Sequence, residues 1–248
     1  MKRAFQNLLP ALTGAGLLHT ALFTDLYLRY VKAGLRPLLI ASGALLLLLA
    51  LTSAATSAGR RPDDHGHGHP DGHGHDHTGT PRVAWLLLLP ALSLLWYAPP
   101  ALGAYTAARA NDKPVTVQRG FAPLPATSPL PLTLTEFTKR VRQDRGLAIK
   151  GRTVRLTGFV TPAGRDGGWY LTRIVFSCCA ADSQTVRVRM YGTPAPPADT
   201  WLSVTGAWHP SGTLGTATAQ AALDVRDARP IAPPVNAYTD DLPLTPSS

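Results

Sequence analysis

The sequence has few of the residues that carry most enzyme chemistry. Its 248 residues include two cysteines, two methionines and a single glutamate, Glu136. Paired-carboxylate acid/base catalysis would therefore depend on aspartates alone. The chain also has no G-x-S-x-G nucleophile motif, no phosphate-cradling glycine loop and no H-E-x-x-H metalloprotease motif. These absences argue against an enzyme, and we expect a protein without catalytic residues.

The positive charge is not concentrated in any one region, although the formal net charge is +9. Residues 1–131 carry 11 basic and 6 acidic side chains, and residues 132–248 carry 13 and 9. No basic stripe is interleaved with stacking aromatic residues, so nucleic acid is not an expected partner. Contact with lipid headgroups explains a thinly spread positive charge better.

Three runs of the N-terminal part contain no Asp, Glu, Lys or Arg, namely residues 4–24, 37–59 and 83–108. Each run is long enough to cross about 30 Å of hydrocarbon as a helix. We therefore predict a membrane part at residues 1–110. Its three transmembrane helices are expected at about 8–29, 37–58 and 83–105.

The first run is predicted to be a retained helix and not a cleaved signal peptide. No small-x-small cleavage site leads into a polar mature region there, because a second apolar run begins at Pro37. That second helix contains the small residues Ala41, Ser42, Gly43 and Ala44, which permit another helix to approach closely.

A histidine-rich loop is predicted at residues 60–81, between the second and third apolar runs. It contains six histidines together with four aspartates, and its alternating glycines prevent core packing. This composition is typical of loose binding of a transition metal such as zinc. The competing interpretation is a flexible spacer with no metal function. The candidate ligands in this loop are His65, His67, His69, His73, His75 and His77.

The remaining chain is expected to form a proline-rich linker at 111–131 and a soluble domain at 132–248. The capping-box spacing of Thr133 and Glu136 predicts one helix at about 134–145. Beyond Gly151 the hydrophobic period changes to two, which indicates strands. One helix with about five strands suits a small OB-like barrel, and a sandwich is the alternative. The five strands are expected at 152–160, 169–177, 185–191, 201–208 and about 216–231.

The most distinctive local pattern is the adjacent pair Cys178 and Cys179, followed by Asp182, at the end of the second predicted strand. The two cysteines exclude a disulfide framework between distant segments, but adjacent thiols could hold zinc or another transition metal, with Asp182 and His209 as further ligands. Consecutive strand residues point to opposite faces, so both sulfurs reach one ion only where the strand breaks or bulges.

Two other interpretations of this pair remain open. A vicinal disulfide could act as a redox element, with Arg173 lowering the cost of a thiolate nearby. Alternatively, the two cysteines are small buried hydrophobic residues, which is common for free cysteine.

Several linked pieces of the sequence resemble the YcgQ-like family, the shorter subunit of a bacterial two-component permease with a C-terminal domain of unknown function. The most specific piece is Arg173 followed by Cys178, Cys179 and Asp182. Others are the two helices joined by a short basic turn, the histidine loop, Pro99-Pro100, Gly158-Phe159-Val160 and the Trp201-x-x-Val204-x-Gly206 pattern. The resemblance implies association with a larger multi-spanning permease subunit and a role in metal-ion handling.

The sequence thus favours a membrane-anchored accessory subunit of a permease, linked to transition-metal handling. Two alternatives stay open, namely a structural partner that binds no metal and a membrane thiol-redox protein. We expect a multi-pass protein of the bacterial cell membrane. Lys2 and Arg3 before the first helix favour a cytoplasmic N-terminus and an external C-terminal domain.

Overall fold

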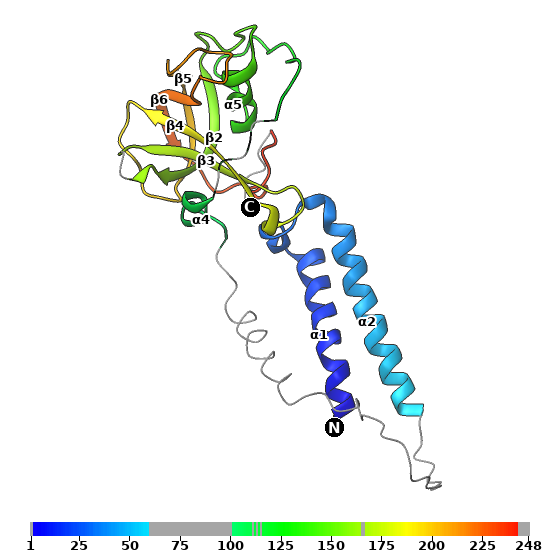
Figure 1. The fold of residues 1–248 in the computed structure, drawn as a ribbon. Coiled ribbons are helices and arrows are strands. Elements are labelled where there is room, and N and C mark those ends of the chain that lie inside the picture. Colours follow the sequence, from blue (N-terminus) through cyan, green and yellow to red (C-terminus); the bar gives the residue numbers. More distant parts are fainter. Residues whose placement is uncertain are drawn as a thin grey trace, which may run out of the picture.

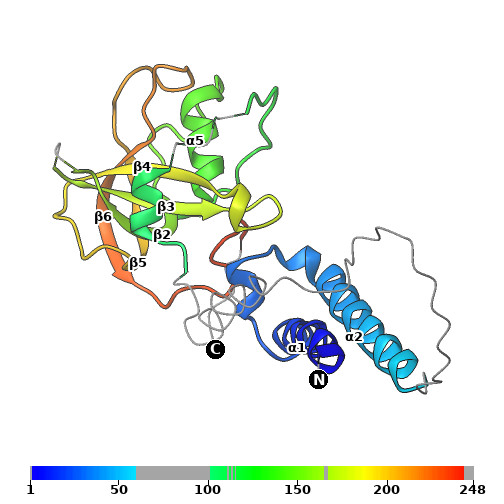
Figure 2. The same ribbon diagram turned by 60° about the horizontal axis from the view of Figure 1, so that its bottom comes forward.

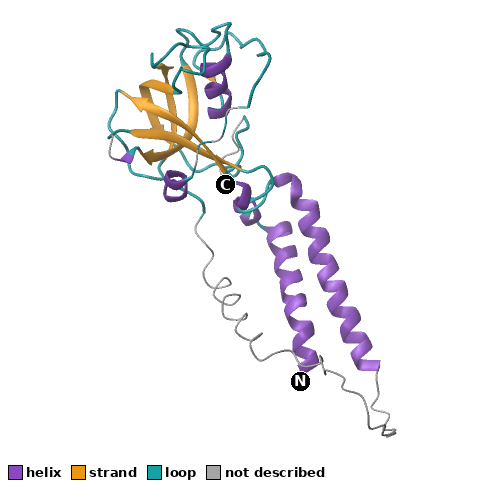
Figure 3. Ribbon diagram, in the orientation of Figure 1, coloured by secondary structure: helices purple, strands orange, loops and turns teal. Residues whose placement is uncertain are grey.

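The structure is a computed structural model that describes residues 2–59, 101–110, 112, 114, 116–164 and 167–242. A β-domain lies at one end, and two long helices extend away from it side by side (Figure 1). The strands gather entirely in the β-domain (Figure 3). The predicted histidine loop and residues 83–100 of the third predicted span lie outside the described residues.

The two long helices are α1 (Lys2–Phe23) and α2 (Arg36–Gly59), joined by the short helices η1 (Leu26–Arg29) and η2 (Ala33–Leu35). They approach each other closely at two glycines. A Cβ atom on Gly14 would lie 2.8 Å from the carbonyl oxygen of Gly43. Only a residue without a side chain allows the two backbones to pack this closely, as the small residues of the second helix predicted.

The first predicted span, 8–29, was placed too far along the chain, because α1 ends at Phe23. The hydroxyl of Thr24 donates to the carbonyl of Thr20 (2.9 Å) and accepts from the amide of Leu26 (3.3 Å). Such local side-chain bonds compete with helix continuation. The chain then turns through η1 and η2 before α2 begins, close to the predicted boundary at residue 37.

One helix of the described part, Ala33–Thr56, is long and apolar enough to cross a membrane. The apolar part of α1, Leu8–Phe23, is shorter. The prediction of three transmembrane helices is therefore not confirmed. At the end of the third predicted span, residues 101–103 form no helix, and a separate short helix, α4 (Ala104–Arg109), begins at Ala104.

The C-terminal domain is a mixed sheet of six strands in the order β1-β2-β3-β4-β6-β5, and β2 pairs with β5 as well. The pairs β1–β2 and β4–β6 are parallel, and the other pairs are antiparallel. The strands are β1 (Leu130–Pro131), β2 (Val154–Pro162), β3 (Trp169–Val175), β4 (Gln184–Tyr191), β5 (Trp201–Trp208) and β6 (Ala222–Pro230).

A mainly-β C-terminal domain is confirmed in this coarser form, whereas the predicted OB-like barrel is not. The sheet has the additional strand β1, which the sequence pattern did not reveal. The β4–β6 pairing joins only residues 189–191 to residues 222–224. Four of the five predicted strands lie within two residues of their expected bounds, whereas the fifth, expected at about 216–231, begins only at Ala222.

Helix α5 (Leu134–Gln143) packs one apolar face on the sheet, as its periodicity predicted. Leu134, Phe137 and Val141 are fully buried in the main core with residues of the strands. The hydroxyl of Thr133 accepts from the amide of Glu136 (3.0 Å), which caps the helix. The helix and the sheet thus form a rigid base for the loop that follows β3.

We predict that Gly158→Ala destabilises the β-domain, because the new Cβ would lie 2.6 Å from the backbone oxygen of Thr172 on the neighbouring strand. The expected loss is about 1–3 kcal/mol in the free energy of unfolding. Circular dichroism during thermal unfolding of the full chain measures it. Gly120→Ala is the matched control, since nothing lies within 4 Å of that position. Equal stability of the two variants would contradict the close strand packing.

Candidate functional site

The two cysteines lie in a loop that begins where β3 ends. β3 ends at Val175, and the chain passes through Cys178 and Cys179 into the short helix η5 (Ala180–Asp182) before β4. The two sulfur atoms are 3.6 Å apart. The alternation of a strand therefore does not separate them, and the break that the sequence analysis required is present.

The carboxylate of Asp182 holds this loop through three backbone amides. Its Oδ1 atom accepts from the amides of Ser177 (3.0 Å) and Cys179 (3.3 Å), and its Oδ2 atom accepts from the amide of Cys178 (2.7 Å). These bonds fix the backbone on both sides of the sulfurs. They also use much of the hydrogen-bonding capacity of the carboxylate, which was predicted as a metal ligand.

Asp182 also affects the ionisation of the exposed thiol. A hydrogen bond with the Asp182 carboxylate, followed by one with Cys179, raises the pKa of Cys178 to about 11. The same hydrogen bond with Cys178 lowers the pKa of Asp182. Cys178 is thus a protonated thiol at neutral pH, unlike reactive cysteines, which have lowered pKa values.

The cysteine loop is also bonded to the turn between the two long helices. The amide of Lys32 donates to the carbonyl of Cys178 (2.9 Å), and the amide of Ala180 donates to the carbonyl of Tyr30 (2.8 Å). Val31 and Cys179 thereby form an isolated antiparallel bridge. Figures 1 and 2 both show the turn between α1 and α2 directly beneath this side of the β-domain.

Arg173 is not among the causes of the raised Cys178 pKa, which are hydrogen bonds with Asp182 and Cys179, followed by burial and by the charges of the same two residues. The guanidinium is almost fully buried and lies over the ring of Trp201, 5.1 Å from its centroid. It donates to the carbonyls of Asn236 and Thr239. Burial lowers the pKa of Arg173 to about 10. Arg173 therefore anchors the C-terminal segment of the domain.

His209 is held elsewhere in the sheet. Its Nδ1 atom lies 2.7 Å from Oδ1 of Asp224, and its ring stacks on Tyr191 with centroids 4.0 Å apart. Within the described residues, no three side chains of His, Cys, Asp and Glu gather into a metal-binding group. The structure therefore brings Cys178, Cys179 and Asp182 into one loop without His209. The predicted ligands His65, His67, His69, His73, His75 and His77 lie outside the described residues.

The contacts that surround the cysteine loop were not predicted from the sequence. The segment after β6 returns to β3, where the carbonyl of Tyr238 accepts from the amide of Phe176 (3.1 Å) and the two rings stack 4.5 Å apart. The carboxylate of Asp240 accepts from the amide of Thr135 (2.8 Å). The only sequence signal for these contacts was an aromatic residue, Tyr238, and two aspartates, Asp240 and Asp241, in a segment without hydrophobic periodicity.

Comparison with known proteins assigns the β-domain to one family model. Residues 144–239 match the model described as the DUF1980 C-terminal domain. The match covers most of the sheet, the cysteine loop and the returning C-terminal segment, and it supports a DUF1980-type protein. No curated protein and no solved structure matches the chain.

We predict that Asp182→Asn increases the reactivity of Cys178 by lowering its raised pKa towards the ordinary value of about 8.5. The larger thiolate fraction is partly offset by lower intrinsic nucleophilicity, so the expected gain at pH 8 is roughly tenfold. Iodoacetamide labelling in a Cys179→Ser background measures it, with the exposed Asp224→Asn as control. A labelling rate that Asp182→Asn leaves unchanged would show that the carboxylate does not suppress ionisation.

Proposed function

We propose that this chain is a membrane-anchored accessory subunit whose β-domain presents two thiols to a soft metal ion such as zinc. The observation that carries the proposal is the 3.6 Å separation of the Cys178 and Cys179 sulfurs. Zinc–sulfur bonds of about 2.3 Å at a tetrahedral angle place two thiolates about 3.8 Å apart. The sulfurs already have nearly this spacing.

The loop supplies two ligands of the four that zinc prefers. Asp182 is occupied by three backbone amides, and no third ligand from the described residues lies with the sulfurs. Sites that hold metal permanently are closed by four protein ligands, whereas an incomplete set leaves positions open. An open two-thiol site suits transient capture and transfer, with the remaining ligands supplied by water or by a partner such as a larger permease subunit.

The surface of α2 supports the membrane anchoring. Only 11% of its most apolar stretch of 18 residues is buried, whereas the core helix of a soluble protein is mostly buried. Its exposed leucines include Leu38, Leu45 and Leu51, each more than half exposed. Such a large apolar surface needs lipid or another apolar helix around it.

The arrangement of the helices supports a multi-pass topology. The β-domain is bonded to the turn between α1 and α2, so it lies on the same side of the bilayer as that turn. Gly59 ends α2 at the far end of the helix, and the chain has returned to the β-domain at Leu102, whose carbonyl accepts from Tyr238 (2.9 Å). If α2 spans the bilayer, the intervening chain crosses it again, which accounts for the third apolar run.

This topology separates the two candidate metal sites. The histidine tract follows Gly59 directly and therefore starts on the side opposite to the cysteines. The two sets of ligands then lie on opposite faces of the membrane. Transfer of a metal ion between them requires a path through a partner. This separation agrees with the proposed role as an accessory subunit of a permease. In that role the subunit has a cytoplasmic N-terminus and an external β-domain.

The two alternative functions have less support. A thiol-redox role favours a cysteine with a lowered pKa, whereas the pKa of Cys178 is raised to about 11. Zinc also binds the thiolate, but the metal itself displaces the thiol proton when it binds. A structural partner that binds no metal would use the solvent-facing side of β4, where Arg187 and Arg189 lie, but both side chains already have intramolecular contacts. Arg187 pairs with Asp112 (2.6 Å), and Arg189 donates to the carbonyl of Gly167 (2.5 Å) while its guanidinium lies over the ring of Tyr170.

We predict that the full chain in detergent, with the six tract histidines replaced by alanine, retains one zinc-binding site per chain. Replacing both Cys178 and Cys179 by serine in this background should remove that site, because serine hydroxyls are poor zinc ligands. Competition with a chromophoric chelator measures the stoichiometry. Ser177→Ala is the control, since it changes a neighbouring side chain and spares both thiols. Retention of zinc by the double serine variant would disprove the cysteine site.

The topology predicts opposite accessibility of the turn and the histidine tract. In a background without native cysteines, Gly34→Cys should react with a membrane-impermeant maleimide on intact cells, since Gly34 is exposed in the turn. Gly72→Cys should react only after permeabilisation. Labelling of both positions from one side would refute the multi-pass arrangement.

A further inference from the structure

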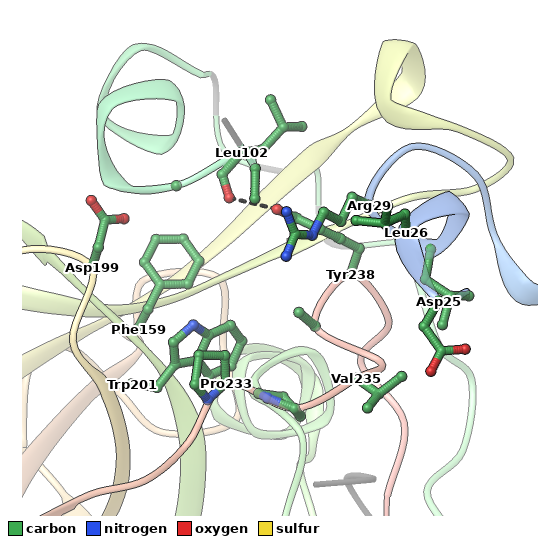
Figure 4. Close-up of a pocket in the computed structure, with 15 residues that line it drawn as sticks. Asp25, Leu26, Arg29, Leu102, Phe159, Asp199, Trp201, Pro233, Val235 and Tyr238 are labelled. Carbon is green, nitrogen blue, oxygen red and sulfur yellow. Dashed lines mark hydrogen bonds between the residues drawn. The ribbon is translucent and has the colours of Figure 1, made fainter. Parts of the chain in front are cut away.

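A cavity of about 560 Å³ lies at the junction between the β-domain and the helical hairpin, which consists of α1, α2 and the turn that joins them. Its walls come from three parts of the chain, namely η1, residues 101–103 and the β-domain with its segment 233–238. Figure 4 shows these walls converging around an open centre. Its volume falls within the range of about 300–1,000 Å³ that is usual for small-molecule sites.

The walls of this junction cavity are mainly aromatic and aliphatic. The rings of Phe159 and Trp201 lie 5.6 Å apart at one side, and the ring of Tyr238 forms part of another side. Leu26 and Leu28 of η1 line the membrane-proximal side. Tryptophan and tyrosine are enriched where hydrocarbon meets headgroups, so these walls suit a ligand that is partly buried in the bilayer.

One cation faces this apolar space. Arg29 is an exposed residue that lines the cavity, and Figure 4 shows its guanidinium beside Tyr238. Arg29 has no hydrogen-bond or ion-pair partner among the residues that the structure describes. The carboxylate of Asp199 lines the cavity too, but its Oδ1 atom already accepts from the amide of Ala104 (2.5 Å). Asp25 immediately precedes η1, and in Figure 4 its carboxylate is directed away from the guanidinium of Arg29.

We propose that the junction cavity binds a glycerophospholipid, with the phosphate on Arg29 and an acyl chain against Phe159 and Trp201. The proposal rests on the membrane anchoring argued above, because η1 directly follows α1 and a lipid would then enter from the surrounding leaflet. The guanidinium of arginine can donate two parallel hydrogen bonds to phosphate oxygens, and the aromatic walls can pack against the acyl chain. A free phosphate would leave these apolar walls without a partner.

Bound lipid would add a second link between the hairpin and the β-domain. The first link is the pairing of the turn with the cysteine loop, on a different set of residues. Lipid in the junction cavity would contact η1 and the strands together. It would therefore hold the metal-binding loop at a fixed height above the bilayer.

Native mass spectrometry of the full chain released from detergent micelles tests this site. The protein is incubated with vesicle-derived dioleoyl phosphatidylglycerol or dioleoyl phosphatidylethanolamine, and we expect one phospholipid to remain on each chain. Arg29→Gln should weaken retention roughly tenfold or more, because the charge-assisted bonds to phosphate are lost. Val235→Trp, which fills the cavity from another element, should also reduce retention. Arg142→Gln, at an exposed arginine of α5, is the control and should retain lipid.

Inorganic phosphate in excess distinguishes the two sources of a phosphate group, and it should leave the retained lipid in place. Displacement by phosphate, or equal retention by wild type, Arg29→Gln and Val235→Trp, would overturn the lipid site. Membrane fractionation and zinc stoichiometry of Arg29→Gln should both equal wild type. These two readouts separate failure of the lipid site from failure of the membrane-anchored metal function.

Discussion

The carboxylate of Asp182 is the group on which the candidate site depends. It accepts from the amides of Ser177, Cys178 and Cys179, and these bonds give the loop its shape. That shape sets the spacing of the two sulfurs. It also directs the carbonyl of Cys178 and the amide of Ala180 outwards, where the helical turn pairs with them. One side chain therefore connects the geometry of the two sulfurs to the turn between the long helices.

The C-terminal segment reinforces this arrangement from the other side. Arg173 is buried beneath Trp201 and bonds to the carbonyls of Asn236 and Thr239, and Tyr238 stacks on Phe176 just before the cysteine loop. Two buried atoms of the Arg173 side chain, Nε and Nη1, have no hydrogen-bond partner among the residues that the structure describes. A buried cation is costly unless it is bonded, so the segment that satisfies its remaining nitrogen is held firmly in place.

Strands β4 and β5 could be predicted because their buried and partly exposed positions alternate regularly. Val186, Val188 and Met190 point into the core, and Arg187 and Arg189 point away from it, as the period of two requires. The capping box at Thr133 likewise placed the start of α5. Strand β1 contains only two residues, too few for any periodicity, and its parallel partner is distant in sequence.

The site was predictable in its residue types but not in its contacts. The adjacency of Cys178 and Cys179 drew attention to one loop, and the structure places Asp182 in that loop with them. However, the carboxylate of Asp182 accepts hydrogen bonds from backbone amides, which occupies the oxygens that a metal would need. His209 pairs with Asp224. The bridge between Val31 and Cys179 joins segments far apart in sequence through backbone atoms alone, so no side-chain pattern records it.

X-ray absorption spectroscopy at the zinc edge tests the central claim most directly. The sample is the zinc-loaded full chain in which the six tract histidines have been replaced by alanine. Two sulfur scatterers at about 2.3 Å from each zinc are the predicted result. A first shell that consists only of nitrogen and oxygen would contradict the account.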